Sequence, residues 1–226
     1  MSSGQTISPT LSGESRGGRI LRYTFGERLN HWITGFAYTY CLWTGLAFWS
    51  PYLYWMATIV GSGPTARFWH PWIGLIFTVT IFWMHALWRG DMTHTARDRE
   101  WTKNVKYYVQ NRDEMMPAQE RFNAGQKQFY WILFWGAIVL LLTGIIMWLP
   151  ERMPLGLRWV LRLATIIHSA AALITIGAII IHIYMGLWMT PGSLKAMIEG
   201  HVSKQWARAH HRLWFERVTG VKPGSR

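Results

Sequence analysis

Two histidines in one long apolar stretch, His168 and His182, have the spacing that haem ligation requires. A strongly polar side chain inside an apolar segment is a functional candidate, because burying it away from water is unfavourable. Fourteen residues of helix rise about 21 Å, and the two positions differ in facing by about 40°. One helix would therefore present both imidazoles to the same side at two depths. Neutral imidazole is a good axial ligand of haem iron, so this helix could serve two stacked haems.

Each of these imidazoles needs a partner at its own depth, and the order of the apolar stretches supplies one. His70 begins the second stretch and lies at the level of His168, whereas His31 begins the first and lies at the level of His182. The alternative is that these four are structural or interfacial histidines, but their match in two level pairs favours ligation. His85 also lies near the inner level. On depth alone it could replace His31 as the partner of His182.

Four stretches with almost no charge position these histidines, at roughly 31–50, 71–89, 129–149 and 163–189. About 20 helical residues cross a hydrocarbon core of about 30 Å. The stretches lack the period-two alternation of a membrane barrel, so we expect helices. We expect the second helix to open at His70-Pro71, because proline suits a first helical turn. The predicted fold is all-α: an integral membrane four-helix bundle with two stacked b haems and both termini cytoplasmic.

The chain is basic, with 23 Lys and Arg against 11 Asp and Glu, and their placement indicates membrane topology. Four of the basic residues precede residue 29, eight lie from Arg89 to Lys127, and seven lie from Lys195 onward. With both termini on one side, the other side receives only Arg67, Arg152, Arg158 and Arg162. This asymmetry predicts cytoplasmic termini and contact with membrane lipids, and argues against a nucleic-acid partner. Many of the 16 tryptophans lie near the expected membrane interfaces.

The polar segments define the expected organisation of the 226 residues. Residues 1–18 are expected to form a disordered cytoplasmic tail without a cleavable signal sequence, and 19–190 a transmembrane dihaem cytochrome b domain. Residues 191–226 are expected to form a basic amphipathic tail on the cytoplasmic side. A short helix is expected around 99–110. Cys41 stands alone, and its thiol is expected to be buried and inert.

Several motifs surround the histidines and carry a family resemblance. They are R-x-x-x-x-E-R-x-N-H-W ending at Trp32, F-W-H-P-W-I-G around His70, and R-F-N-A-G-Q-K at 121–127. With the two histidines of the fourth stretch, these segments resemble the cytochrome b (gamma) subunit of membrane-bound respiratory formate dehydrogenase over roughly residues 19–215. Related hydrogenase cytochromes also have about four spans and two haems, but N-A-G-Q-K is typical of the formate dehydrogenase branch.

The resemblance implies a role for each matching residue. His70 and His168 would ligate the outer haem b, and His31 and His182 the inner one, which decides between His31 and His85. Asn123 would help to bind the substrate quinone, menaquinone or ubiquinone, beside the inner haem. Gln126 could also donate a hydrogen bond to a quinone carbonyl. The alternative for Asn123 is a capping or turn role in Asn-Ala-Gly.

The resemblance further implies the partners and the location. Electrons would come from an iron–sulfur (beta) subunit, and through it from a molybdenum or tungsten catalytic (alpha) subunit, at the periplasmic face of a bacterial inner membrane. This chain has no cysteine cluster and no ligand set for that metal, so no catalytic residue for formate is predicted. We expect an electron-transfer subunit that contains the quinone-reducing site. The alternatives are a cytochrome b subunit of a hydrogenase or thiosulfate reductase, and a haem-free membrane anchor or transporter.

Overall fold

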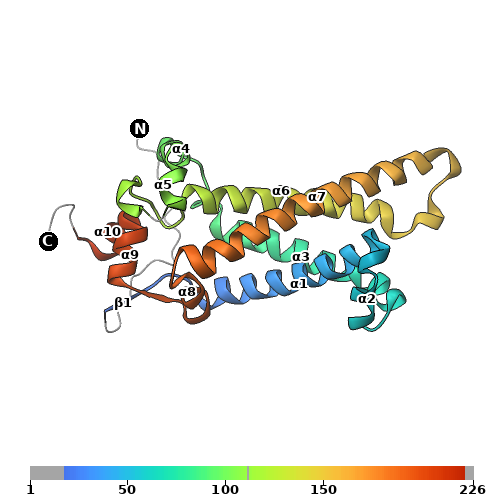
Figure 1. The fold of residues 1–226 in the computed structure, drawn as a ribbon, viewed down its shortest axis with the longest axis horizontal. Coiled ribbons are helices and arrows are strands. Elements are labelled where there is room, and N and C mark those ends of the chain that lie inside the picture. The colour runs from blue at the N-terminus through green and yellow to red at the C-terminus, as the bar shows by residue number, and fades with distance from the viewer. Residues whose placement is uncertain (1–17, 111, 222–226) are drawn as a thin grey trace. The chain divides into compact units, whose positions relative to one another are not determined.

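The computed structural model describes residues 18–110 and 112–221, most of them helical (Figure 1). The chain divides into two compact units. Residues 29–86 and 129–182 form the first, called here the bundle unit. The second, the terminal unit, takes its described residues from Met1–Arg28, Leu87–Gln128 and Ile183–Arg226. Of the predicted disordered tail, residues 1–17 lie outside the described part of the chain.

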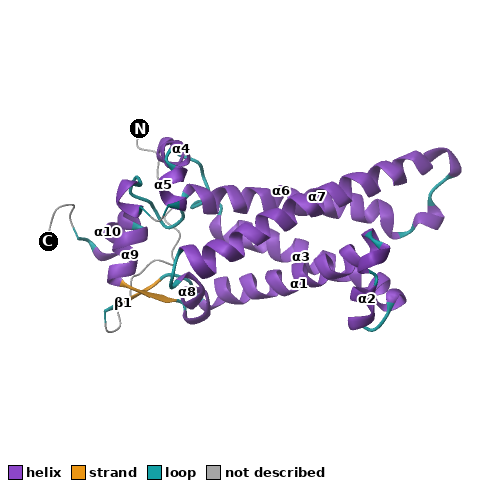
Figure 2. Cartoon of the chain, in the orientation of Figure 1, coloured by secondary structure: helices purple, strands orange, loops and turns teal. Residues whose placement is uncertain are grey.

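Four long helices supply the bundle unit (Figure 2). They are α1 (Phe25–Trp49), α3 (Gly63–Trp88), α6 (Ala124–Trp148) and α7 (Arg158–Tyr184). Within the described chain, three helical segments are long and apolar enough to cross a membrane: Gly63–Trp88, Ala124–Trp148 and Leu155–Met189. Helix α1 has 25 residues, but Thr and Tyr side chains interrupt its apolar sequence. The largely helical fold is therefore confirmed, with three candidate membrane spans, while the fourth span stays a prediction.

The middle of the bundle unit is a close-packed apolar layer. Ala37, Tyr38, Phe77, Ile81, Leu133, Phe134 and Ala137 form this buried cluster, which joins α1, α3 and α6. Helix α7 meets it at Thr175, whose hydroxyl lies 3.0 Å from the Tyr38 hydroxyl. Gly136 lets α6 and α7 approach closely, since a Cβ there would lie 2.6 Å from Cγ2 of Thr175. This layer packs all four helices together.

The connection between α1 and α3 folds back on α1. It contains a 3-10 turn at Pro51–Leu53 and the short helix α2 (Trp55–Ile59). Met56 and Ala57 are buried against Ala47, and the Trp43 indole donates to the Met56 carbonyl at 2.9 Å. Packing of this connection on α1 fixes the point from which α3 starts.

The expected start of the second long helix at His70-Pro71 is wrong, because α3 begins at Gly63 and contains Pro71 in its interior. Pro64, not Pro71, occupies the first turn, where a missing N–H leaves no hydrogen bond unmade. At Pro71 the helix continues without the hydrogen bond to the Arg67 carbonyl. His70 therefore sits on regular helix, two turns from its start, and not at a helix end.

The terminal unit is built from short elements. Strands β1 (Arg19–Leu21) and β2 (His201–Ser203) pair antiparallel with Ile20 opposite Val202. The helices are α4 (Ala96–Lys103), α5 (Val105–Val109), α8 (Ser193–Glu199), α9 (Lys204–His210) and α10 (Arg212–Thr219). The single helix expected around 99–110 is two, separated at Asn104. The strands were not predicted, because three residues are too few to show an alternation.

The contact between Gly136 and Thr175 gives a first prediction. Gly136→Ala should lower the stability of the bundle by roughly 1–3 kcal/mol, because its Cβ overlaps Cγ2 of Thr175. Adding Thr175→Ser removes Cγ2 and keeps the hydroxyl that bonds Tyr38, so it should recover most of the lost stability. The thermal midpoint of the purified protein in detergent measures both. Gly177→Ala is the control, because no atom lies within 4 Å of its Cβ; an equal loss there would contradict the explanation.

Candidate functional site

The bundle unit brings the four predicted histidines together in two pairs. The ring centres of His70 on α3 and His168 on α7 are 6.4 Å apart. Those of His31 on α1 and His182 on α7 are 6.1 Å apart. A metal held between two imidazole nitrogens at about 2 Å each places the ring centres ~6 Å apart, once the nitrogen-to-centre distance is included. Each pair therefore fits the ligation of its own iron atom.

The number of ligands at each pair matches haem iron in particular. Within the described residues, no group of three or more His, Cys, Asp or Glu side chains is placed to hold a metal ion. Two imidazoles alone leave four ligand positions in a plane between them, which a porphyrin fills. Each pair also has an aromatic neighbour, Phe48 at His70 and Phe129 at His182, and such apolar surfaces suit a porphyrin ring. The donor set thus fits b-type haem at both levels.

The His70–His168 pair is held by matching contacts from two other helices. Nδ1 of His70 lies 2.7 Å from the hydroxyl of Thr44 on α1, and Nδ1 of His168 lies 2.8 Å from that of Thr143 on α6. A glycine follows each threonine, and a Cβ added there would lie 3.6 Å (Gly45) or 3.5 Å (Gly144) from Cε1 of the imidazole. Because Nδ1 of each ring is engaged in these contacts, Nε2 is the nitrogen left for a ligand.

The His31–His182 pair has different surroundings. The His182 ring stacks on Phe129 of α6, with ring centres 4.3 Å apart and planes 2° from parallel. Trp32 meets the His31 ring edge-on at 5.4 Å. Nδ1 of His31 is buried and has no hydrogen-bond partner among the described residues. Aromatic packing, and not hydrogen bonding to a hydroxyl, therefore orients this pair.

His85, the other candidate partner of His182, occupies a different environment. Its Nδ1 is hydrogen-bonded to the Tyr130 hydroxyl, and its ring stacks on Phe134 at 4.5 Å. Both contacts are to α6, and His182 faces His31. The structure thus pairs the ring of His182 with that of His31, and gives His85 its own partners; ligation of a haem by His31 stays a prediction.

Asn123 and Gln126 lie in the terminal unit, at the first turn of α6. The Asn123 side-chain oxygen accepts from the Gln126 backbone N–H at 2.9 Å, and the Gln126 side-chain oxygen accepts from the Asn123 N–H at 3.0 Å. These reciprocal bonds satisfy two N–H groups at a helix start, as in a capping box. These two capping bonds use only the side-chain oxygens, so they leave the amide NH₂ groups of Asn123 and Gln126 to donate to other partners.

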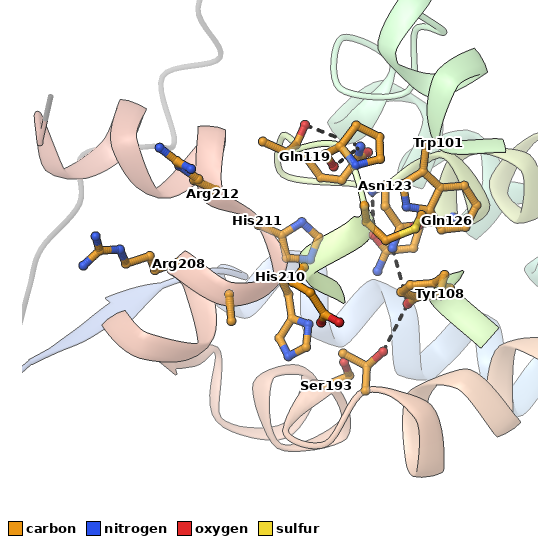
Figure 3. Close-up of a pocket in the computed structure, with 16 residues that line it drawn as sticks. Trp101, Tyr108, Gln119, Asn123, Gln126, Ser193, Arg208, His210, His211 and Arg212 are labelled. Carbon is orange, nitrogen blue, oxygen red and sulfur yellow. Dashed lines mark hydrogen bonds between the residues drawn. The ribbon is translucent and has the colours of Figure 1, made fainter. Parts of the chain in front are cut away.

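Both amides line a polar cavity of about 280 Å³ (Figure 3). Trp101 and Tyr108 form aromatic parts of its wall. The Tyr108 hydroxyl lies 3.1 Å from that of Thr190 and accepts a long hydrogen bond, 3.5 Å, from the Asn123 amide. An aromatic wall next to amide and hydroxyl donors suits a flat ligand that carries carbonyl groups.

Two of the motifs in the sequence meet in a buried charge network within the terminal unit. Arg121 donates to the Glu27 carboxylate and to the Arg22 carbonyl, both at 2.7 Å. Arg22 donates in return to the Arg121 carbonyl at 2.9 Å. Burial alone would raise the pKa of Glu27, but Arg121 and hydrogen bonds from Thr24 and Trp88 hold it below its usual range. These motif residues therefore hold β1 to the segment that precedes α6.

His211 completes this network and has a defined tautomer. Its Nδ1–H donates to the Glu120 carbonyl at 2.7 Å, so Nε2 accepts from the Arg22 guanidinium at 2.9 Å. Burial and the neighbouring guanidinium lower the pKa of His211 well below 6.5. His211 is only 2 % exposed, although it lies in a polar, basic segment of the sequence. Its ring also lies next to that of Trp206, with ring centres 5.4 Å apart.

The sequence reasoning missed Thr44, Thr143 and Phe129. A Thr-Gly dipeptide occurs in each of two apolar stretches, and this repeated pair was the available signal. Phe129 carried no signal, because aromatic residues are frequent in these stretches. Which helix face they occupy relative to the histidines depends on helix rotation, which the spacing along one helix does not give.

The fold and this site define a membrane cytochrome, and comparison with known proteins specifies the family. Residues 22–200 match the prokaryotic cytochrome b561 family, and the chain belongs to it. The formate dehydrogenase cytochrome b556(fdo) subunit of Escherichia coli K12 is 37 % identical over 200 residues, covering 88 % of this chain and 93 % of that protein.

Two further relatives agree. The nitrate-inducible formate dehydrogenase cytochrome b556(Fdn) subunit of the same strain is 32 % identical over 204 residues, 90 % of this chain and 94 % of that protein. The formate dehydrogenase cytochrome b556 subunit of Haemophilus influenzae Rd is 32 % identical over 197 residues, which cover 87 % of this chain and 82 % of that protein. The resemblance stated from the motifs, and the predicted cytochrome b membrane subunit in electron transfer, are confirmed.

The buried His211 gives a second prediction, on pH. The folded state keeps His211 neutral, whereas the unfolded chain takes up a proton below about pH 6.5, so stability falls as the pH drops. The slope approaches about 1.4 kcal/mol per pH unit. Thermal midpoints between pH 7.5 and 5.5 measure it. His211→Gln should have lower stability at pH 7.5 but a flatter pH dependence. The exposed His94→Gln should keep the wild-type slope, and an unchanged slope in the His211 variant would contradict the assignment.

Proposed function

We propose that this chain is the dihaem cytochrome b subunit of a membrane-bound formate dehydrogenase, and that it conducts electrons across the membrane to a quinone. The observation that carries the proposal is the pair of bis-histidine arrangements, with ring centres 6.4 and 6.1 Å apart, at two levels of one helix bundle. The names of the three relatives support the partner enzyme. The iron–sulfur and catalytic subunits would be separate chains.

The protein residues would hold the haems and set their environment. His70 and His168 would ligate one iron, and His31 and His182 the other. Each haem, when bound, supplies a reversible one-electron couple. The helices orient the four imidazoles and exclude water from the bundle. The layer of Tyr38, Thr175 and Gly136 keeps the two levels apart, and fourteen residues of α7 correspond to about 21 Å between them.

The charge distribution supports the direction of flow. Most Lys and Arg residues lie in the segments of the terminal unit, which would place that unit in the cytoplasm together with both termini. The His70–His168 pair would then be on the periplasmic side and receive electrons from the iron–sulfur partner. Electrons would pass to the His31–His182 pair. Moving each charge inward against the usual membrane potential stores about 2.3 kcal/mol per 100 mV.

The cavity with Asn123 and Gln126 is the proposed quinone head-group site. Their side-chain oxygens cap α6, so the NH₂ groups could donate to a quinone carbonyl. Tyr108 and Trp101 would pack against the ring, and the Tyr108 hydroxyl could donate a further hydrogen bond. Protons for the reduced quinone would come from the cytoplasm. Capping and quinone binding are therefore compatible roles for Asn123, and the alternative of capping alone is tested below.

Replacing His31 or His85 with alanine tests the haem assignment. Membranes with the wild-type complex should show two low-spin b haems per chain in a reduced-minus-oxidised spectrum, both reduced by formate. His31→Ala should lose one haem, because an axial ligand is missing, whereas His85→Ala should keep both. The opposite result would assign His85 to the site. Reduction by hydrogen instead of formate would identify a hydrogenase partner, and a colourless protein would leave a membrane anchor or transporter.

A substitution that separates capping from donation tests the quinone site. Asn123→Asp keeps the oxygen that caps α6 but removes the NH₂ donor. The KM for quinone should rise about 10-fold, the effect of one lost hydrogen bond of about 1–2 kcal/mol, while formate still reduces both haems. Asn104→Asp is the control, since Asn104 is outside the cavity. An unchanged KM in the Asn123 variant would limit Asn123 to its capping role.

A further inference from the structure

The two hydroxyls that contact the His70–His168 pair have only one possible role in those contacts. Each threonine hydroxyl carries a single proton. Thr44 Oγ1 lies 2.8 Å from the Tyr40 carbonyl, and Thr143 Oγ1 lies 2.6 Å from the Val139 carbonyl. A carbonyl oxygen can only accept, so each hydroxyl proton points to the preceding helical turn. Each Oγ1 must then accept from the imidazole.

This proton count fixes the tautomer of both rings. With Thr44 as acceptor, His70 carries its proton on Nδ1, and with Thr143 as acceptor so does His168. Nε2 of each ring then has a free lone pair. The ring centres of His70 and His168 are 6.4 Å apart, so one iron atom fits between their two Nε2 lone pairs. The hydroxyl contacts thus prepare both imidazoles as ligands before any haem is present.

We propose that Thr44 and Thr143 are positioning residues for one haem only, and that they lower its reduction potential by hydrogen-bonding both of its axial imidazoles. The inference rests on the proposed haem ligation by His70 and His168. A hydrogen bond from Nδ1–H makes the imidazole a stronger donor, as outer partners of metal-bound histidines do. Stronger donation favours ferric over ferrous iron. The chain's own helices α1 and α6 therefore tune a haem that is ligated from α3 and α7.

The His31–His182 pair has no such threonine hydroxyl contact among the described residues. Nδ1 of His31 has no partner in the described part of the chain, and the His182 ring is held by the face of Phe129. The hydrogen-bond contribution therefore acts at one level of the bundle and makes the two sites unequal. Taken alone, this contribution lowers the reduction potential of the haem at the His70–His168 site relative to that of the haem at the His31–His182 site. This difference favours electron transfer in the direction proposed above.

Valine substitutions test the role, because valine keeps the shape of threonine and lacks the hydroxyl. In the intact complex in native membranes, potentiometric titration of the haem bands should show two components in the wild type. Thr44→Val and Thr143→Val should each shift one component to higher potential and leave the other in place. The low-spin ferric EPR signal of that same haem should move. The affinity of the chain for that haem, measured by how much haem is retained on detergent extraction, should fall about 10- to 100-fold.

Matched variants separate tuning from a structural effect. Thr78→Val is the control, since Thr78 on α3 donates to the Gly74 carbonyl in the same way but has no hydrogen bond to a histidine among the described residues. It should leave both potentials unchanged. Thr44→Ser and Thr143→Ser keep the hydroxyl and should restore the wild-type values. If a valine variant fails to assemble, Thr44→Ala and Thr143→Ala remove the same hydroxyl without its bulk.

The outcomes distinguish this inference from the proposed function. A shift of one component in the valine or alanine variants, absent in Thr78→Val, supports it. Two haems at wild-type potentials and EPR positions in these variants would overturn it and leave the proposed function standing. A shift of both components would also overturn it, because the hydroxyls contact one pair only. A wild-type complex with fewer than two haems would instead overturn the proposed function.

Discussion

An imidazole at the depth of a lipid bilayer needs a partner for each of its nitrogens, because no water is there to provide one. The bundle unit meets this requirement differently at its two levels. At His70 and His168, threonine hydroxyls take one nitrogen of each ring and leave the other facing its counterpart. At His31 and His182, aromatic faces hold the rings, and one buried nitrogen has no partner among the described residues. A buried polar atom without a partner is rare in folded proteins, so Nδ1 of His31 is a point at which a bound group or a polar contact could complete the inner pair.

The rest of the bundle serves to keep these pairs at a fixed separation. Tyr38 and Thr175 join α1 to α7 by their hydroxyls, and Gly136 lets α6 approach α7 at the same depth. Because packed interiors do not deform continuously, a layer of this kind sets the distance between the levels more firmly than the helices could alone. The exposed apolar side chains on the four helices face what would be lipid, and so their exposure is compatible with a stable membrane protein.

The terminal unit shows that residues of the family motifs need not be redox residues. Arg22, Glu27 and Arg121 belong to the segments that carry the family resemblance, yet their contacts are with one another. A buried carboxylate held by a guanidinium is strongly destabilised if either partner is removed, which makes such a network a sensitive structural lock. Lys127 and Asp98 form a second buried ion pair at 2.9 Å that ties the start of α6 to α4. The cavity proposed for the quinone thus lies at the start of α6, which this ion pair holds to α4.

Sequence alone determined the helical membrane character of this protein and the two histidine pairs as candidates, because both depend on local quantities: the length of apolar runs and the rise and turn per residue of a helix. Spacing could not choose between His31 and His85, since the periodicity along one helix does not fix its rotation against the next; only the family resemblance favoured His31. The tertiary structure places His85 against Tyr130 and Phe134 and the His31 ring beside His182. It also decided the start of α3 at Gly63, the β1–β2 pairing and the threonine contacts of His70 and His168. These features depend on side-chain directions and on contacts between residues distant in the chain, which no local pattern contains.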